Sequence, residues 1–180
     1  MSQQTSLLFS KIKIANESDN KVLSETHLGF YSNYSRFVLK ALRKSSFQEF
    51  FYWVLLSENI EEKNVNTVDI NIFPALRKNG FNIVGKCNIF RGKIRIYPKT
   101  SNFCDAFSKK FGKNILIAYV GNRARAALIH EVLHLKYGSN EQKVRELTEA
   151  YYSVYLQKQL TKDSAVMQNL IFNAKKPSLY

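Results

Sequence analysis

Helical spacing of apolar residues defines the first elements that the chain predicts. Over residues 34–44 apolar side chains recur three and four positions apart, and basic side chains fall on the opposite side. Ser46 and Glu49 then have the spacing of a capping box, so we expect a second helix over residues 47–57. The aromatic run of this second helix is expected to lie in the core.

An alternating pattern follows and predicts a small sheet. Val68, Ile70 and Ile72 alternate with other residues before Pro74, which closes the first strand. Further strands are expected over residues 81–89, 93–97 and 115–120, the last of them buried. Near the N-terminus, Ile12 and Ile14 alternate with lysines in the manner of a short edge strand.

Helical patterns return between these strands and in the last third of the chain. Residues 99–113 are basic and carry phenylalanines on a four-residue repeat, which is typical of a small amphipathic helix. A longer helix is expected after Asn122, and Gly138 is well suited to end it. A capping box over residues 139–142 begins a last long helix, which should reach about residue 159.

Together these elements predict an α+β protein, with a small mixed or antiparallel sheet packed on a long helix. The length of 180 residues is that of one compact domain, which we place at residues 34–160. Residues 1–33 would form an N-terminal extension and residues 161–180 a C-terminal tail.

The composition narrows the classes of protein to which the chain can belong. It is 45% hydrophobic, which is enough for a core, yet its longest apolar run has seven residues and is too short for a membrane span. Cys87 and Cys104 form no disulfide framework. We therefore expect a soluble intracellular protein with no membrane association. The net charge of +13 favours a polyanionic partner such as nucleic acid.

The long helix carries the candidate chemistry, because residues 130–134 read His-Glu-Val-Leu-His. His130 and His134 lie one above the other on a helix, so both imidazoles can reach one metal ion. In an HExxH helix the two histidines hold Zn²⁺ and the glutamate, here Glu131, accepts a proton from water. The surrounding apolar residues indicate that the helix is buried. Buried imidazoles need polar partners, and a metal ion would satisfy both of them at once.

A catalytic zinc site needs a third protein ligand, and the last helix is the natural source of one. It offers Glu141, Glu146 and Glu149. If the two helices form an antiparallel hairpin, Glu141 lies below His134, whereas Glu146 and Glu149 lie near the height of the histidine pair. The spacing therefore disfavours Glu141 and leaves the choice between the other two open.

Over about residues 65–158 the order of strands, HExxH helix and second helix resembles the minimal gluzincins and the SprT-like and WLM (Wss1-like) zinc metallopeptidases. This resemblance implies a zincin-like fold. In the SprT-like and WLM pattern the third ligand is a later histidine, which this sequence lacks. Gluzincins of the ImmA/IrrE type instead take a glutamate from the next helix, in a Glu-Ala pair followed by aromatic and small residues. Residues 149–153 are similar to that pattern, which implies Glu149 as the third ligand.

The expected function is that of a zinc-dependent endopeptidase acting on a protein or peptide substrate. The metal is held by His130, His134 and Glu149, and Glu131 acts as the general base. A strand edge, over residues 93–97 or 115–120, is expected to hold the substrate as an added strand. The candidates for stabilising the oxyanion are Tyr137, Tyr151, Tyr152 and Tyr155.

The basic charge, together with the SprT-like resemblance, suggests substrates that are associated with DNA. The alternative is a basic nucleic-acid-binding module in which the zinc site is structural or inactive.

Overall fold

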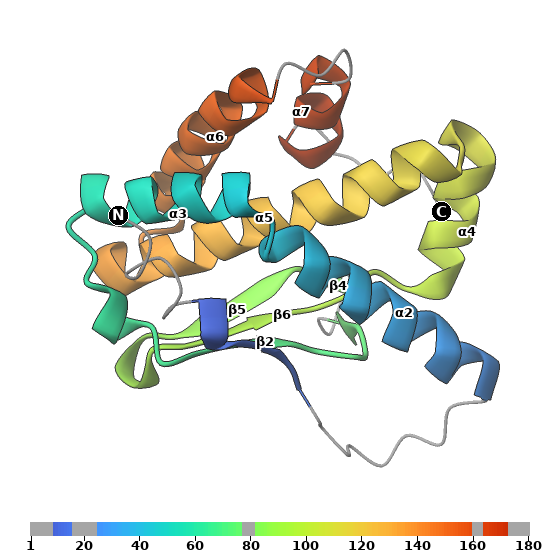
Figure 1. Ribbon diagram of the computed structural model, residues 1–180, viewed down its shortest axis with the longest axis horizontal. Helices are drawn as coiled ribbons and strands as arrows, with labels where there is room; N and C mark the ends of the chain where they lie inside the picture. The colour runs from blue at the N-terminus through green and yellow to red at the C-terminus, as the bar shows by residue number, and fades with distance from the viewer. Residues whose placement is uncertain (1–8, 16–24, 77–81, 160–163, 173–180) are drawn as a thin grey trace.

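The computed structural model describes residues 9–15, 25–76, 82–159 and 164–172, and these ranges form an α+β fold. Helices cover one face of a small sheet, and α5 runs along that sheet (Figure 1). The helices are α2 (Glu25–Leu42), α3 (Ser45–Ser57), α4 (Ser101–Phe111), α5 (Lys113–Tyr137), α6 (Glu141–Lys158) and α7 (Ser164–Phe172). Within these described ranges, no helix is both long and apolar enough to cross a membrane.

The main sheet is mixed and has the strand order β1-β2-β6-β5. Its strands are β1 (Ile12–Ile14), β2 (Thr67–Ile70), β5 (Gly85–Asn88) and β6 (Lys93–Ile96). The first three strands of that order run parallel, and β5 is antiparallel to β6. A separate two-stranded ladder joins β3 (Ala75–Leu76) to β4 (Asn82–Ile83). The expected edge strand at Ile12 and Ile14 is thus confirmed.

Isoleucine and valine side chains of the sheet meet the helices in one core. Val68 pairs with Ile12 on one side and with Ile94 on the other, and all three are almost completely buried. The aromatic run of α3 supplies Phe47, Phe50 and Phe51 to the same core, as expected. Close packing between the apolar side chains of the sheet and those of the helices therefore fixes the distance between α5 and the strands.

The expected boundary between residues 33 and 34 falls inside α2, which begins at Glu25. Strand β1 precedes that boundary and pairs with β2, so it belongs to the main sheet. The strand expected over residues 81–89 is divided into β4 and β5, and Phe81 lies outside the described residues. The expected helix within residues 99–113 is α4, with Phe107 buried.

One expected strand is wrong, because residues 115–120 belong to the first turns of α5. A short apolar run has no period that separates a buried strand from a buried helix. Gly121 does not interrupt the helix: it faces α2, where an added methyl group would lie 3.4 Å from the Cβ of Ala41. The helix that carries the two histidines is therefore 25 residues long, and it is anchored well before the motif.

Candidate metal centre

Helix α5 brings His130 and His134 to one face with their Nε2 atoms 3.2 Å apart. The rings stand nearly perpendicular to each other, with their centroids 4.9 Å apart. Both side chains are largely but not fully buried. The expected convergence of the two imidazoles is therefore present, and it follows from the four-residue spacing on one helix.

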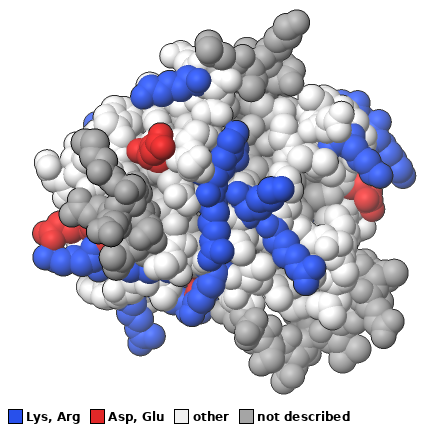
Figure 2. All heavy atoms as spheres, viewed as in Figure 1, with Lys and Arg blue, Asp and Glu red and all other residues white. Residues whose placement is uncertain are grey.

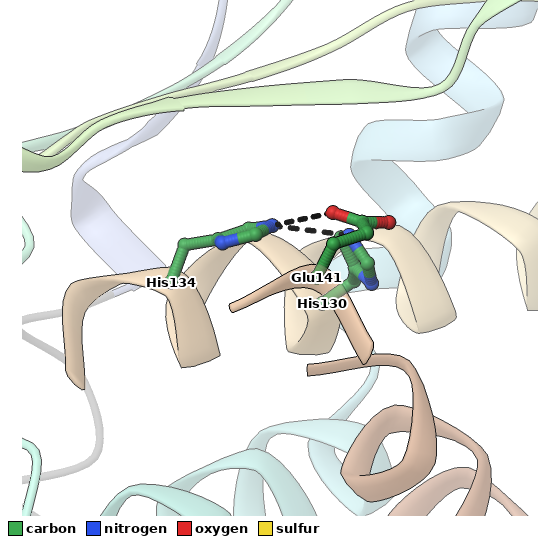
Figure 3. Close-up of side chains that lie close together, drawn as sticks. All are labelled: His130, His134 and Glu141. Atoms are coloured by element: carbon green, nitrogen blue, oxygen red, sulfur yellow. Dashed lines mark hydrogen bonds and ion pairs between the residues drawn. The ribbon is translucent and has the colours of Figure 1, made fainter. Parts of the chain in front are cut away.

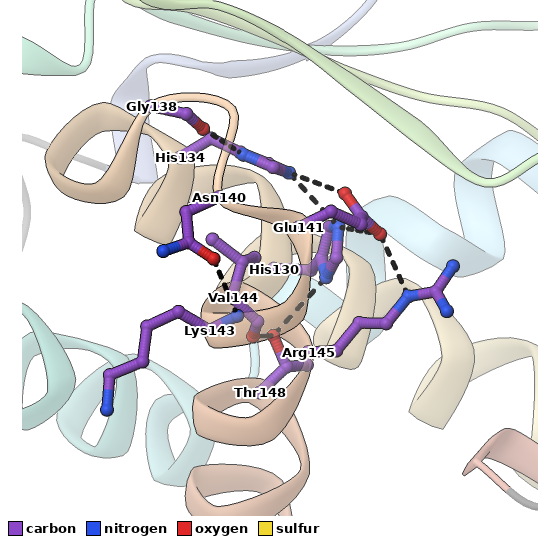
Figure 4. A network of polar contacts seen from close by, with 9 residues as sticks. All are labelled: His130, His134, Gly138, Asn140, Glu141, Lys143, Val144, Arg145 and Thr148. Atoms are coloured by element: carbon purple, nitrogen blue, oxygen red, sulfur yellow. Dashed lines mark hydrogen bonds and ion pairs between the residues drawn. The ribbon is translucent and has the colours of Figure 1, made fainter.

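The other nitrogen of each imidazole has a partner that fixes the direction of the ring (Figure 4). His134 Nδ1 lies 2.6 Å from the carbonyl oxygen of Gly138, which can only accept a hydrogen bond. His130 Nδ1 lies 3.4 Å from the hydroxyl of Thr148, which itself donates to the carbonyl of Val144. Both Nδ1 atoms are therefore assigned as the protonated ones, and both Nε2 lone pairs are directed towards the same point.

Glu141, the first residue of α6, lies beside this point (Figure 3). Its carboxylate oxygens lie 3.6 Å from His130 Nε2 and 3.4 Å from His134 Nε2. Asn140 caps the helix by accepting a hydrogen bond from the backbone N–H of Lys143. Arg145, one turn further along α6, donates to Glu141 across 2.9 Å. The cap and this ion pair hold the carboxylate at the histidines.

The structure therefore differs from the expectation for the third ligand, because Glu141 rather than Glu149 stands beside the histidines. Glu149 is exposed, and Glu146 is exposed and accepts a hydrogen bond from Gln142. The reason is the turn between the helices: Gly138 has φ 58° and ψ −129°, and α6 leaves α5 at a steep angle instead of running back beside it (Figure 1). The first turn of α6 is therefore the part that covers the pair.

The three side chains fit a small divalent ion. Ligand atoms ~2.0–2.1 Å from a tetrahedral zinc lie ~3.3 Å from one another. Here the two Nε2 atoms are 3.2 Å apart, and the carboxylate approaches each with a different oxygen, Oε1 at 3.6 Å from His130 and Oε2 at 3.4 Å from His134. Two imidazole lone pairs directed at one point repel each other unless a proton or a cation lies between them. Burial lowers the pKa of His130, and His134 and Arg145 lower it further while Glu141 opposes them, so the neutral, metal-ligating form of His130 is favoured.

Glu131 lies against the sheet, where it meets β5. An added methyl group at Gly85 would lie 2.5 Å from Glu131 Oε1 and 2.7 Å from its Cγ, so this side chain occupies the space that the glycine leaves. Burial, with the charge of Glu141, raises the pKa of the Glu131 carboxyl to about 8, although a hydrogen bond from the backbone N–H of Cys87 opposes the shift. A cation at the histidines would favour the ionised carboxylate.

The strand beside the motif is β5, which is the outer strand of the sheet. The two segments expected to hold substrate do not form this edge. Strand β6 lies between β2 and β5, and residues 115–120 are helical. In the β5–β6 ladder, Tyr97 N–H donates to the carbonyl of Val84, so the backbone groups of Gly85 and Cys87 point away from β6. Among the residues described, β5 is therefore the sheet edge that lies at the site.

The tyrosines expected to stabilise an oxyanion are engaged elsewhere. Tyr137 and Tyr151 both donate to the carboxylate of Glu58, which also accepts from Lys136. Tyr152 is buried and donates to Asn122, and Tyr155 is buried among aromatic residues of α3. These contacts give the tyrosines structural roles.

The sequence did not single out Gly85 and Thr148, which meet Glu131 and His130, or Glu58, which joins α3 to α5 and α6. Thr148 has a signal that could have been used, because it lies seven residues after Glu141 and so shares its face of α6. Gly85 and Glu58 carry no comparable signal, since each meets its partner only through tertiary packing. The third histidine of the chain, His27, lies in a polar segment whose side chains are not described.

Comparisons of the chain with family models, with curated proteins and with solved structures each found no match.

Proposed function

We propose that the protein is a zinc-dependent peptidase that hydrolyses peptide bonds at the His130, His134 and Glu141 centre. One observation carries the proposal: ligand atoms of these three residues converge within 4.8 Å of one another, and the motif places Glu131 next to His130. Two imidazoles and one carboxylate are a ligand set of catalytic zinc, which leaves a fourth position for water or substrate. Structural zinc sites have four protein ligands, and three converge among the residues described.

His130, His134 and Glu141 would hold the ion, with Gly138 and Thr148 holding the imidazoles in place. Zinc, when bound, supplies a Lewis acid that polarises a carbonyl and lowers the pKa of water to about 7. The carboxylate of Glu131 takes a proton from the attacking water and delivers it to the leaving amide nitrogen. Its position against β5 keeps it close to any chain lying along that strand.

Strand β5 suits an extended peptide because its outward backbone groups can pair with an added strand. At Cys87 the N–H already donates to Glu131, so a peptide would pair with the outward groups that remain. Hydrogen bonds from the strand would fix the peptide backbone without reading its side chains. The substrate class that follows is an unfolded segment or loop of a protein, held in extended form.

The test separates metal binding from catalysis. Glu131→Gln should retain zinc at one equivalent per chain and lose peptidase activity by at least about 100-fold, since the general base is gone. Metal content is measured on the purified protein, and activity on a quenched fluorescent peptide library. Full activity in this variant would contradict the proposal.

A matched pair on α6 tests the third ligand. Glu141→Gln should weaken zinc binding by at least about 100-fold, as loss of a direct ligand, while Glu149→Gln should leave it unchanged. Both residues are exposed on the same helix, so the two variants remove the same charge from the same element. Zinc affinity is measured by competition with a chromogenic chelator. The reverse order of effects would restore Glu149 as the ligand.

A further inference from the structure

The solvent side of α2 and of the turn after it is basic. From residue 33 to residue 44 the exposed residues are Asn33, Arg36, Lys40, Arg43 and Lys44. The apolar residues between them, such as Val38 and Leu42, are buried in the core. We call Arg36, Lys40, Arg43 and Lys44 the α2 basic surface. In Figure 2 lysine and arginine side chains form a row across the face on which α2 lies.

No acidic residue balances these cations along the chain, because residues 26–48 contain no Asp or Glu. Among the residues described, Arg36, Lys40 and Lys44 make no ion pair, and Arg43 donates to the carbonyl oxygen of Ile12. Helix α6 is different, since there Arg145 pairs with Glu141. Like charges on one helix face repel each other, so α2 keeps an unbalanced charge that a polyanion would neutralise.

The spacing of the surface fits a phosphate backbone. Arg36 and Lys40 are four residues apart on α2, or about 6 Å along the helix, and Arg43 and Lys44 follow directly after its end. A duplex carries about three to four phosphate charges over about 6 Å. Long flexible lysine and arginine side chains can reach such charges without a preformed pocket.

A membrane surface fits the same face less well. A helix that lies on a lipid bilayer inserts an apolar face beside its basic one. Here the exposed residues over this stretch are polar or charged, and the apolar face of α2 packs on α5 and the sheet. Anionic lipid is therefore an outcome that the test must separate from nucleic acid.

The surface is also separate from the metal centre. Helix α2 meets α5 at Gly121 and Arg125, where Arg125 Nε donates to the carbonyl of Ala41. These contacts lie about one and a half to two and a half helical turns before His130. A polyanion on α2 would leave the histidine pair and strand β5 uncovered.

We propose that the α2 basic surface binds the phosphate backbone of nucleic acid without reading its sequence. The proposal does not depend on peptidase activity. Its probe is a fluorescent 20-base-pair DNA duplex, titrated with the full chain at several salt concentrations. The wild type should bind with an affinity that falls steeply with salt.

Two triple variants with the same change in net charge provide the comparison. Arg36→Glu, Lys40→Glu and Lys44→Glu together should weaken duplex binding by at least about 100-fold and flatten the salt slope. The control changes Lys109, Lys110 and Lys113 to Glu at the junction of α4 and α5, which are also exposed. It should lose less than about fivefold. Circular dichroism checks folding, and the same positions changed to Gln replace any variant that fails to fold.

Equal losses in the two variants would overturn the proposal, because net charge rather than the α2 basic surface would then control binding. Unchanged binding in the α2 variant would do the same. Vesicles of phosphatidylserine and phosphatidylcholine are the second probe: tighter binding to these than to the duplex, lost in the α2 variant, would assign the surface to lipid instead.

Discussion

At the scale of single residues, Gly85 decides where the proposed general base can lie. A side chain at this position would overlap Glu131, with its first carbon 2.5 Å from Oε1. Gly85→Ala should therefore displace the Glu131 carboxylate and reduce peptidase activity by at least about tenfold, while zinc stays bound. We expect a loss of about 1–3 kcal/mol in the free energy of unfolding from overpacking. Activity, zinc content and a urea titration on one preparation measure the three effects.

Gly29 provides the matched control for that substitution. It lies within α2, and an added methyl group there would meet nothing within 4 Å. Gly29→Ala should stabilise the protein by about 0.5–1 kcal/mol, as alanine does within a helix, and leave activity unchanged. If both alanine variants behave alike, the contact between Gly85 and Glu131 does not control the site.

At the scale of elements, Glu58 ties the end of α3 to α5 and α6. Burial raises the pKa of its carboxyl, but hydrogen bonds from Lys136, Tyr151 and Tyr137 outweigh burial and hold the pKa below its ordinary value. A carboxyl with a lowered folded-state pKa stabilises the protein above its ordinary pKa of 4.5, and that stability is lost as pH falls through the folded pKa.

Glu58→Gln should consequently lower the free energy of unfolding by about 2 kcal/mol at pH 7, the typical contribution of a hydrogen bond to a charged group. The difference between wild type and variant should shrink as the pH is lowered past 4.5. Urea midpoints at pH 7 and at progressively lower pH measure it. A difference that stays constant across this range would mean that the charge of Glu58 is not what stabilises the contact.

The elements also show what the sequence could and could not predict. The histidine pair was predictable because its geometry depends only on the four-residue spacing within one helix. The strands around β5 and β6 were predictable from alternation, whereas residues 115–120 were not, because a short apolar run suits either structure. Glu141 was not predicted as the third ligand because its position depends on the angle at which α5 and α6 cross. That crossing depends on Gly138 and on tertiary contacts such as those of Glu58, which no periodicity encodes.

At the scale of the whole molecule, the metal centre lies between α5 and α6, so an ion there would add a link between two helices that already pack on each other. Ligand that binds only the folded state stabilises it by about 2.7 kcal/mol at one hundred times its Kd. For a chain of this size the melting temperature should then rise by about 5–10 °C when zinc is added, and fall again with a chelator. His134→Ala should lose most of this rise, while Glu131→Gln should keep it because Glu131 is not a ligand. An equal rise in all three proteins would show that zinc acts away from the histidine pair, and the peptidase proposal would lose its basis.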